Sequence, residues 1–164
     1  MTEIGLIADT HGLLRPRVLA ALQGCNPIIH AGDVGDPAIL RALDEIAPVF
    51  AVRGNIDRGD WARTLPETQS VSVGDRLIHV LHILDELDFE PEAAGFHVVI
   101  FGHSHRPSVE AKNGVLYVNP GSAGPRRFDL PVTVGRLTLS RGELRVRIVD
   151  TASQRHAAPS EAIR

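Results

Sequence analysis

The first sixty residues alternate short apolar runs with amphipathic segments, and this alternation restricts the fold more than any other feature of the sequence. Apolar runs at residues 4–8, 28–30 and 49–52 predict three buried strands. Pro16 and Pro37 each precede a segment with apolar residues at helical spacing, so each is expected to open a helix. Strands and helices that alternate in this order form a parallel βαβαβ unit.

From residue 68 the sequence changes to the period-two alternation of strands, interrupted by turn signals. Gly74-Asp75, Asn113-Gly114 and Arg141-Gly142 predict three β-hairpins. A buried strand is expected at 98–101, preceded by a short helix at 91–94. Together these elements predict an α/β fold, a four-layer αββα sandwich in which two mixed β-sheets pack face to face with helices outside.

Length and charge set limits on the organisation and the partners of the chain. A chain of 164 residues with 43% hydrophobic content suits one domain, expected over 1–151, whereas 152–164 lacks an apolar period and is expected to be a disordered tail. The net charge is −3 and aromatic residues make up 4%, which argues against extended nucleic acid as a partner. No apolar run approaches the roughly 20 residues that cross a bilayer, so no membrane role is expected.

The compartment is inferred from cysteine usage and from the first residues. The single cysteine, Cys25, has no second cysteine with which to form an internal disulfide. Glu3 and Asp9 interrupt what would have to be the apolar core of a signal peptide. The predicted location is therefore the cytoplasm.

Polar side chains with metal-binding chemistry follow the predicted strands. The carboxyl ends of parallel strands meet at one edge of a sheet, where ligands bind, so these side chains should gather there. Mixed carboxylate, imidazole and amide donors suit Mn, Zn, Fe or Ni rather than Ca or Mg. The residues in these positions are Asp9, His11, Asp33, Asn55, His82, His103 and His105.

Spacing within these segments supports a shared site. Asp9 and His11 lie two residues apart, so both can face one ion, and the GHSH segment repeats this spacing. Gly32 and Gly102 are expected to allow backbone conformations that a side chain would forbid close to an ion. An isolated DxH triplet most often occurs by chance. The ordered series DTH, GDVGD, GNID, LH and GHSH is what indicates a pair of metal ions.

This series resembles the motifs of the calcineurin-like metallophosphoesterases, and within them those of the small single-domain YfcE-type branch. The resemblance spans residues 4–149 and includes the Asn-Pro-Gly-Ser segment at 119–122. It implies two divalent transition-metal ions, with Mn expected first and Zn, Fe or Ni as alternatives. It also implies the ligand sets, which are Asp9, His11 and His105 for one ion, Asn55, His82 and His103 for the other, and Asp33 as the bridge.

The chain departs from the family pattern at two positions. Ile56 follows Asn55 where many larger relatives have a proton-donating histidine. Ile83 follows His82 in place of a glycine or an acid. His79, three residues before His82, is expected to point to the opposite face of the strand and is the alternative ligand if the register differs.

The resemblance and the donor set together predict a binuclear-metal phosphoesterase. Two cations about 3.5–4 Å apart lower the pKa of a shared water, and the resulting bridging hydroxide attacks phosphorus in line. Asp33, as the bridge, and Asn55 are the predicted catalytic residues. The missing histidine at position 56 favours a small phosphodiester as substrate, with a phosphomonoester as the alternative.

Several further residues are candidates for contacts around the site. Arg53, Arg126 and Arg127 are expected to grip a phosphate, the alternative for 126–127 being a solvated surface pair. His30 is expected either to orient a ligand from behind or to be a core histidine bonded to backbone. The polar stretch between Asn55 and residue 68 is long enough for a mobile cover over the site, and an oligomer contact is the alternative.

A catalytically inactive, partner-binding scaffold is the alternative function. The expected fold also resembles that of the retromer scaffold subunit, whose metal pocket is degraded, so the fold alone does not establish activity. A retired site should lack one or more ligands, whereas this sequence holds all seven ligand types, which favours an enzyme. The branch resemblance also implies a homo-oligomer.

Overall fold

A computed structural model of the chain describes residues 1–155 and 160–164. One sheet contains β1 (Thr2–Ile7), β2 (Ile28–His30), β3 (Val49–Ala51), β9 (Thr133–Ser140), β10 (Glu143–Asp150) and β11 (Glu161–Ile163). The other contains β4 (Thr68–Val73), β5 (Arg76–Leu81), β6 (Val98–Ile100), β7 (Ser108–Lys112) and β8 (Val115–Asn119). The helices are α1 (Pro16–Leu22), α2 (Pro37–Asp44), α3 (Asp60–Arg63) and the short 3-10 helix η1 (Leu84–Glu86).

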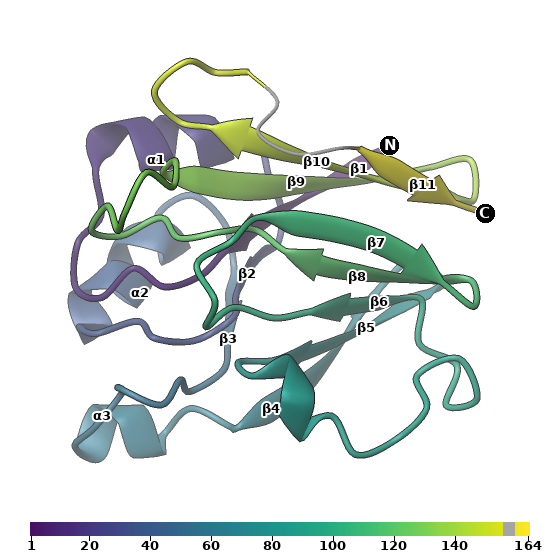
Figure 1. Cartoon of the computed structure of the whole chain (residues 1–164), viewed down its shortest axis with the longest axis horizontal. Helices are drawn as coiled ribbons and strands as arrows, with labels where there is room; N and C mark the ends of the chain where they lie inside the picture. Colours follow the sequence, from purple (N-terminus) through teal and green to yellow (C-terminus); the bar gives the residue numbers. More distant parts are fainter. Residues whose placement is uncertain (156–159) are drawn as a thin grey trace.

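Both sheets are mixed, as predicted. The first has the order β11-β10-β9-β1-β2-β3, in which β1, β2 and β3 are parallel and β9 runs antiparallel to β1. The second has the order β4-β5-β6-β8-β7, with three parallel strands at its centre and antiparallel edges. The loops that follow β1 and β6 meet on the left side of the molecule in Figure 1. That edge is where the candidate site lies.

Two apolar layers hold the sandwich together. Ile4 and Leu6 of β1 are fully buried between the sheets, where they join Ile100 of β6 in one cluster. Ile7 points to the other face of β1 and packs with Leu22 of α1 under the helices. Alternation along one strand therefore supplies both layers, and it fixes the register that brings the end of β1 to the site.

The outer layer of the second sheet is thinner than expected. Residues 91–94 form turns instead of the predicted helix. The N–H of Ala94 bonds to the carbonyl of Glu90 and closes one turn, and Gly95, left-handed with φ of 80°, then ends it. In the part of the chain that the structure describes, Leu84 of η1 and Leu87 just after it pack against that face of the sheet.

The prediction of a disordered tail is wrong for residues 161–163, which form a strand. Glu161–Ile163 forms β11, which pairs with the edge strand β10 through Leu144 opposite Ile163. The side chain of Ile163 packs against the core between the sheets, a long-range contact that a local pattern does not reveal. Residues 156–159 of the predicted tail lie outside the described residues, and the domain boundary at 151 stays a prediction. Among the described helices, none has the length and apolar character needed to cross a membrane.

Candidate metal centre

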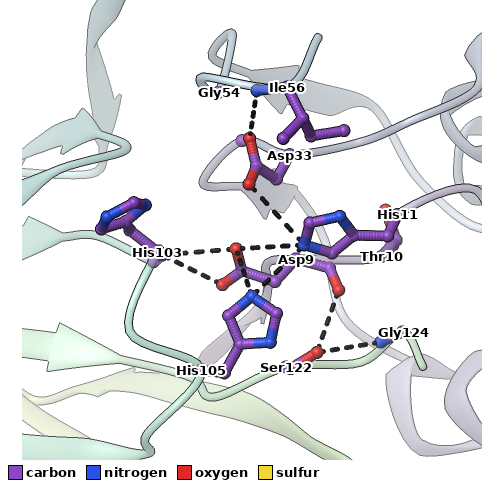
Figure 2. Close-up of polar contacts among 12 residues, drawn as sticks. Asp9, Thr10, His11, Asp33, Gly54, Ile56, His103, His105, Ser122 and Gly124 are labelled. Carbon is purple, nitrogen blue, oxygen red and sulfur yellow. Dashed lines mark hydrogen bonds and ion pairs between the residues drawn. The ribbon is translucent and has the colours of Figure 1, made fainter. Parts of the chain in front are cut away.

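Seven polar side chains from five loops converge where the parallel strands end. They divide into two neighbouring clusters, most members of which appear in Figure 2. The loops follow β1 (Asp9, His11), β2 (Asp33), β3 (Asn55), β5 (His82) and β6 (His103, His105). The sequence prediction that these residues lie together is therefore met by the geometry.

The first cluster consists of Asp9, His11 and His105, whose donor atoms all lie within 4.8 Å of one another. The Nε2 atoms of the two histidines are 3.2 Å apart. Asp9 Oδ1 lies 3.9 Å from Nε2 of His11 and 3.5 Å from Nε2 of His105. Asp9 is completely buried. One carboxylate and two imidazoles thus point at a common position, as a bound cation requires.

The second cluster consists of Asp33, Asn55, His82 and His103. Asn55 Oδ1 lies 3.0 Å from Nε2 of His82 and 3.1 Å from Nδ1 of His103. Asp33 and His82 are buried, whereas His103 is exposed, so this cluster opens towards solvent. Its donor set of carboxylate, amide and imidazoles is the one that the sequence predicts for a second ion.

Asp33 links the two clusters through a single oxygen atom. Its Oδ2 lies 3.6 Å from Nε2 of His11 in the first cluster and 3.3 Å from Nε2 of His82 in the second. The other oxygen, Oδ1, accepts a hydrogen bond of 3.0 Å from the backbone N–H of Ile56, which fixes the carboxylate in place (Figure 2). This position suits a carboxylate that is shared between two ions.

The backbone at most of these ligands is strained. Left-handed φ angles are uncommon for residues other than glycine, and such conformations cost on the order of 1–3 kcal/mol each. They persist where the surrounding structure forces them, and they gather at functional sites. The strained ligands are Asp9 (54°), His11 (45°), Asp33 (54°), His103 (69°) and His105 (60°).

Glycines allow the loops to approach one another closely. Gly32 has φ of 91°, as predicted, and a Cβ atom there would lie 2.8 Å from Nδ1 of His82. Gly102 has no left-handed φ, and its role is closeness alone, because a Cβ atom would lie 2.9 Å from Oδ2 of Asp9. A Cβ atom on Gly54 would collide with the backbone and carboxylate of Asp33.

His82, which directly follows β5, faces the site, whereas His79 within β5 does not. Nδ1 of His82 lies 2.8 Å from the carbonyl oxygen of Ala31, so a proton on Nδ1 leaves Nε2 directed at the second cluster. His79 packs edge-on against Phe89 and Phe96 on the opposite face. The expected strand register is therefore confirmed.

Burial and local hydrogen bonds shift the protonation of the ligands in opposite directions. Burial raises the pKa of Asp9 to about 7. Burial also acts to raise the pKa of Asp33, but hydrogen bonds from His82 and the Ile56 N–H outweigh it and hold that pKa below its usual value. Burial lowers the pKa of His105 to about 4, and nearby Arg127 adds to the effect, so this imidazole is neutral at pH 7.

These residues fit divalent transition-metal ions. Neutral imidazoles, an amide oxygen and carboxylates are the donors that Mn, Zn, Fe and Ni accept. Nε2 of His11 and Nε2 of His105 lie 3.2 Å apart, and both approach Oδ1 of Asp9, so three donor atoms converge on one position. The raised pKa of Asp9 marks a buried carboxylate with too little nearby positive charge, which a cation would supply.

Asp57 lies in the polar stretch that is expected to form a mobile cover or an oligomer contact. Instead it is buried and accepts hydrogen bonds from the backbone N–H groups of Val34 (3.1 Å), Gly35 (2.8 Å) and Gly54 (2.8 Å). It therefore joins the loop of Asp33 to the loop of Asn55. The rest of the stretch contains α3, and Trp61 packs against the apolar cluster under the helices.

The Asn-Pro-Gly-Ser segment supports the first cluster from below. Asn119 Nδ2 donates to the carbonyl of Gly102 at 2.9 Å and to Ser104 Oγ at 3.0 Å, inside the GHSH loop. Ser122 Oγ donates to the backbone carbonyl of Asp9 at 3.0 Å (Figure 2). The segment thus connects the loops that follow β1 and β6.

His30 is a fully buried histidine that bonds to two ligand loops without contacting a ligand side chain. Its Nε2 lies 2.9 Å from Thr10 Oγ1, and that hydroxyl donates to the carbonyl of Val34. Its Nδ1 accepts the backbone N–H of Gly32 at 3.2 Å. Burial lowers the pKa of His30 to about 3, so it is a neutral Nε2–H tautomer.

The three candidate arginines lie in different surroundings. Arg53 lines a cleft of about 540 Å³ together with Asn55 and His82, and it forms a 2.6 Å ion pair with Glu67. Arg127 acts electrostatically on all three members of the first cluster. Arg126 lines a separate groove with Arg15 and Arg17 instead of the cleft beside the ligands.

Known proteins are similar to this chain in sequence or in fold. A protein of Methanothermobacter thermautotrophicus described as a probable metallophosphoesterase is 35% identical over 148 residues, which cover 82% of this chain and 85% of the relative. Vps29 of Chaetomium thermophilum has a TM-score of 0.78 at 21% identity over 99% of this chain and 97% of its own. The phosphoesterase YfcE of E. coli has a TM-score of 0.74 at 23% identity over 99% of this chain and 100% of its own.

The two solved structures establish the fold alone, because they share less than a quarter of the sequence. The domain profile reaches further, since it matches residues 2–142 and includes every proposed ligand. The chain therefore belongs to the calcineurin-like phosphoesterase superfamily.

Proposed function

We propose that the chain is a binuclear-metal phosphoesterase that hydrolyses a small phosphodiester. The observation that carries this proposal is the position of Asp33, whose Oδ2 lies within 3.6 Å of a histidine nitrogen in each cluster. A site for one ion has no need of such a shared carboxylate. Two divalent ions, when bound, supply a water of lowered pKa and neutralise phosphoryl oxygens.

The residues divide the work of holding the two ions. Asp9, His11 and His105 would bind one ion, Asn55, His82 and His103 would bind the other, and Asp33 would contact both. Mn is the ion expected first, and Zn, Fe and Ni suit the same donors. In the described chain, Asp57 and Ser122 keep the loops of the two clusters in place through the hydrogen bonds described above.

The cleft beside the second cluster suits the alcohol part of a small ester. Its volume of about 540 Å³ lies within the range of small-molecule pockets. Its lining residues include Arg53, Arg58 and Glu67, and no Phe, Tyr or Trp lines it. Stacked bases of a nucleic-acid strand would find no platform there, which supports a small substrate.

Position 56 supports a diester over a monoester. Ile56 is 39% exposed and has no proton to donate to a leaving alkoxide. Esters whose alcohol leaves readily depend least on such a donor, and we propose that the substrate is a diester of such an alcohol. Arg127, beside the first cluster, is placed to attract the phosphate.

A partner-binding scaffold is the competing function, favoured by the likeness of the fold to Vps29. The convergence of all seven donors supports an enzyme instead, because a scaffold has no use for five strained ligand residues. The cytoplasmic location and the homo-oligomer stay predictions from the sequence.

Elemental analysis combined with an ester screen tests the proposal. The purified chain should hold about two transition-metal ions and, with Mn²⁺ added, should hydrolyse bis(p-nitrophenyl) phosphate faster than p-nitrophenyl phosphate. Bound metal without hydrolysis of any ester would favour the scaffold. Substoichiometric metal together with no hydrolysis would remove the metal centre itself.

A further inference from the structure

A second, smaller groove lies beside the metal centre on the side of the first cluster. Arg15, Arg17 and Arg126 line it, together with Asp150 and an apolar wall at Pro131. Its volume of about 200 Å³ is below the roughly 300–1,000 Å³ of pockets for drug-sized ligands. The groove is therefore sized for one small chemical group.

The three arginines of this groove have no acidic partner. Across residues 1–155 and 160–164, no carboxylate lies within ion-pair distance of Arg15, Arg17 or Arg126. The carboxylate of Asp150 accepts the backbone N–H of Ala152 at 2.8 Å. Asp150 is the carboxylate among the lining residues, so the groove holds three guanidinium cations against one carboxylate.

Arg15 is held in a fixed position. Its Nη1 donates to the carbonyl of Gly124 at 2.6 Å and to that of Ala123 at 3.5 Å. A guanidinium held through one nitrogen keeps its remaining N–H groups free for a planar, paired contact with an oxyanion. The groove therefore contains a preorganised donor as well as two exposed charges.

The groove is connected to the metal centre by a short path. Gly124, which Arg15 holds, donates its N–H to Ser122 Oγ, and Ser122 donates to the carbonyl of Asp9 (Figure 2). Arg127, the neighbour of Arg126, acts on the first cluster. The groove and the first cluster are therefore joined through one buried hydrogen-bonded segment, residues 122–124.

We propose that this groove is a second anion site, which binds a phosphate group that the substrate carries apart from the scissile one. The proposal rests on the proposed function and names its substrate class, a phosphodiester with an additional phosphate. Arginine suits this task because its guanidinium matches phosphate oxygens with two parallel hydrogen bonds.

Direct binding separates this proposal from the metal chemistry. The full-length chain, treated with EDTA, is titrated with inorganic phosphate by calorimetry. The native chain and Asp33→Asn should bind phosphate equally, whereas R17Q/R126Q should bind about ten-fold more weakly or less. R141Q/R145Q, which removes two charges at the hairpin joining β9 and β10, should match the native chain. Absent binding, or equal binding by R17Q/R126Q, overturns the second site.

Kinetics of the Mn²⁺-loaded enzyme then test the substrate class. Thymidine 5′-(p-nitrophenyl phosphate) is compared with the same ester carrying a 3′-phosphate. The added phosphate should lower KM about ten-fold in the native enzyme and in R141Q/R145Q, and this advantage should vanish in R17Q/R126Q. Hydrolysis of both esters with equal KM by the native enzyme contradicts the second site alone. Absence of all hydrolysis contradicts the proposed function.

Discussion

The two ligand clusters lie at the same edge of the sandwich, but their carboxylates are in opposite electrostatic environments. Asp9 is completely buried, and its carboxylate accepts a hydrogen bond of 3.1 Å from the backbone N–H of His103. Burial raises its pKa to about 7. Asp33 is also buried, but His82 and the N–H of Ile56 hold its pKa below the usual value. The second cluster therefore presents a carboxylate anion across the neutral range. The first cluster becomes fully anionic only above pH 7 or when a cation arrives.

The supports behind the clusters differ in the same sense. The loops of the second cluster are joined by a carboxylate, Asp57, which accepts three backbone N–H groups. The loops of the first cluster are joined by a hydroxyl and an amide, those of Ser122 and Asn119. We infer that the second cluster is the more firmly organised half of the site. The first cluster depends more on its ion.

Removing the shared carboxylate should have the largest effect. Asp33→Asn replaces the oxygen between the clusters with a neutral amide, and turnover of bis(p-nitrophenyl) phosphate with Mn²⁺ should fall about 1,000-fold, as expected when several kcal/mol of charge stabilisation are lost. The melting temperature should change little. Asp44→Asn, an exposed aspartate at the end of α2, is the matched control and should keep native turnover. Native turnover in Asp33→Asn would remove the bridge.

Cutting the supports should destabilise the two halves unequally. Asp57→Ala leaves three backbone N–H groups without their acceptor and should lower the free energy of unfolding by about 3 kcal/mol. Ser122→Ala removes the donor to the Asp9 carbonyl and the acceptor of the Gly124 N–H, a longer bond of 3.3 Å, and should cost about 1 kcal/mol. Urea unfolding of both variants measures the difference. Equal losses would mean that the two halves are equally well held.

His30 bonds to a loop of each cluster and gives stability a pH dependence of known sign. Its pKa is lowered by burial from 6.5 to about 3, so the unfolded chain binds more protons between these values and stability falls as pH falls. The glutamine of His30→Gln does not bind a proton in this pH range. The stability advantage of the native chain over His30→Gln should therefore shrink by about 2 kcal/mol from pH 7.5 to pH 5 in EDTA. A difference that does not vary with pH would show that His30 is not buried as a neutral group.

Metal binding should weaken at both clusters as pH falls. Asp9, with a pKa of about 7, must lose its proton to bind a cation, so affinity at the first cluster should fall about ten-fold for each pH unit below 7. At the second cluster, burial acts to lower the pKa of His82, but hydrogen bonds to Asp33 and to the Ala31 carbonyl outweigh it and raise that pKa, so this imidazole must also lose a proton. Calorimetric titration with Mn²⁺ between pH 8 and pH 6 measures both steps, and Asp9→Asn should remove the part of the pH dependence that Asp9 causes. An unchanged pH dependence in Asp9→Asn would contradict the raised pKa of Asp9.

Local patterns predicted most of the β-strands and the polar residues that gather at their ends. Apolar alternation located β1, β2 and β3, and the rule that ligands collect at strand ends then predicted a common position for Asp9 and Asp33. The two-residue hairpin signals at 113–114 and 141–142 coincide with positive φ angles at all four residues. These features depend on residues that are neighbours in the sequence, and for this reason the sequence alone predicts them.

The features that were missed depend on contacts between distant segments. Asp57 looked like part of a polar loop because its partners, the N–H groups of Val34 and Gly35, lie more than twenty residues away. The pairing of β11 with β10 depends on a free sheet edge that no local pattern describes. Arg126 lines a separate groove with Arg15, and this neighbour is more than a hundred residues away in the sequence.

Anomalous diffraction from crystals grown with Mn²⁺ counts the ions and locates them among the side chains. Two peaks per chain are expected, one among Asp9, His11 and His105 and one among Asn55, His82 and His103, with Asp33 in contact with both. A single peak, or peaks that do not contact these side chains, would contradict a binuclear centre.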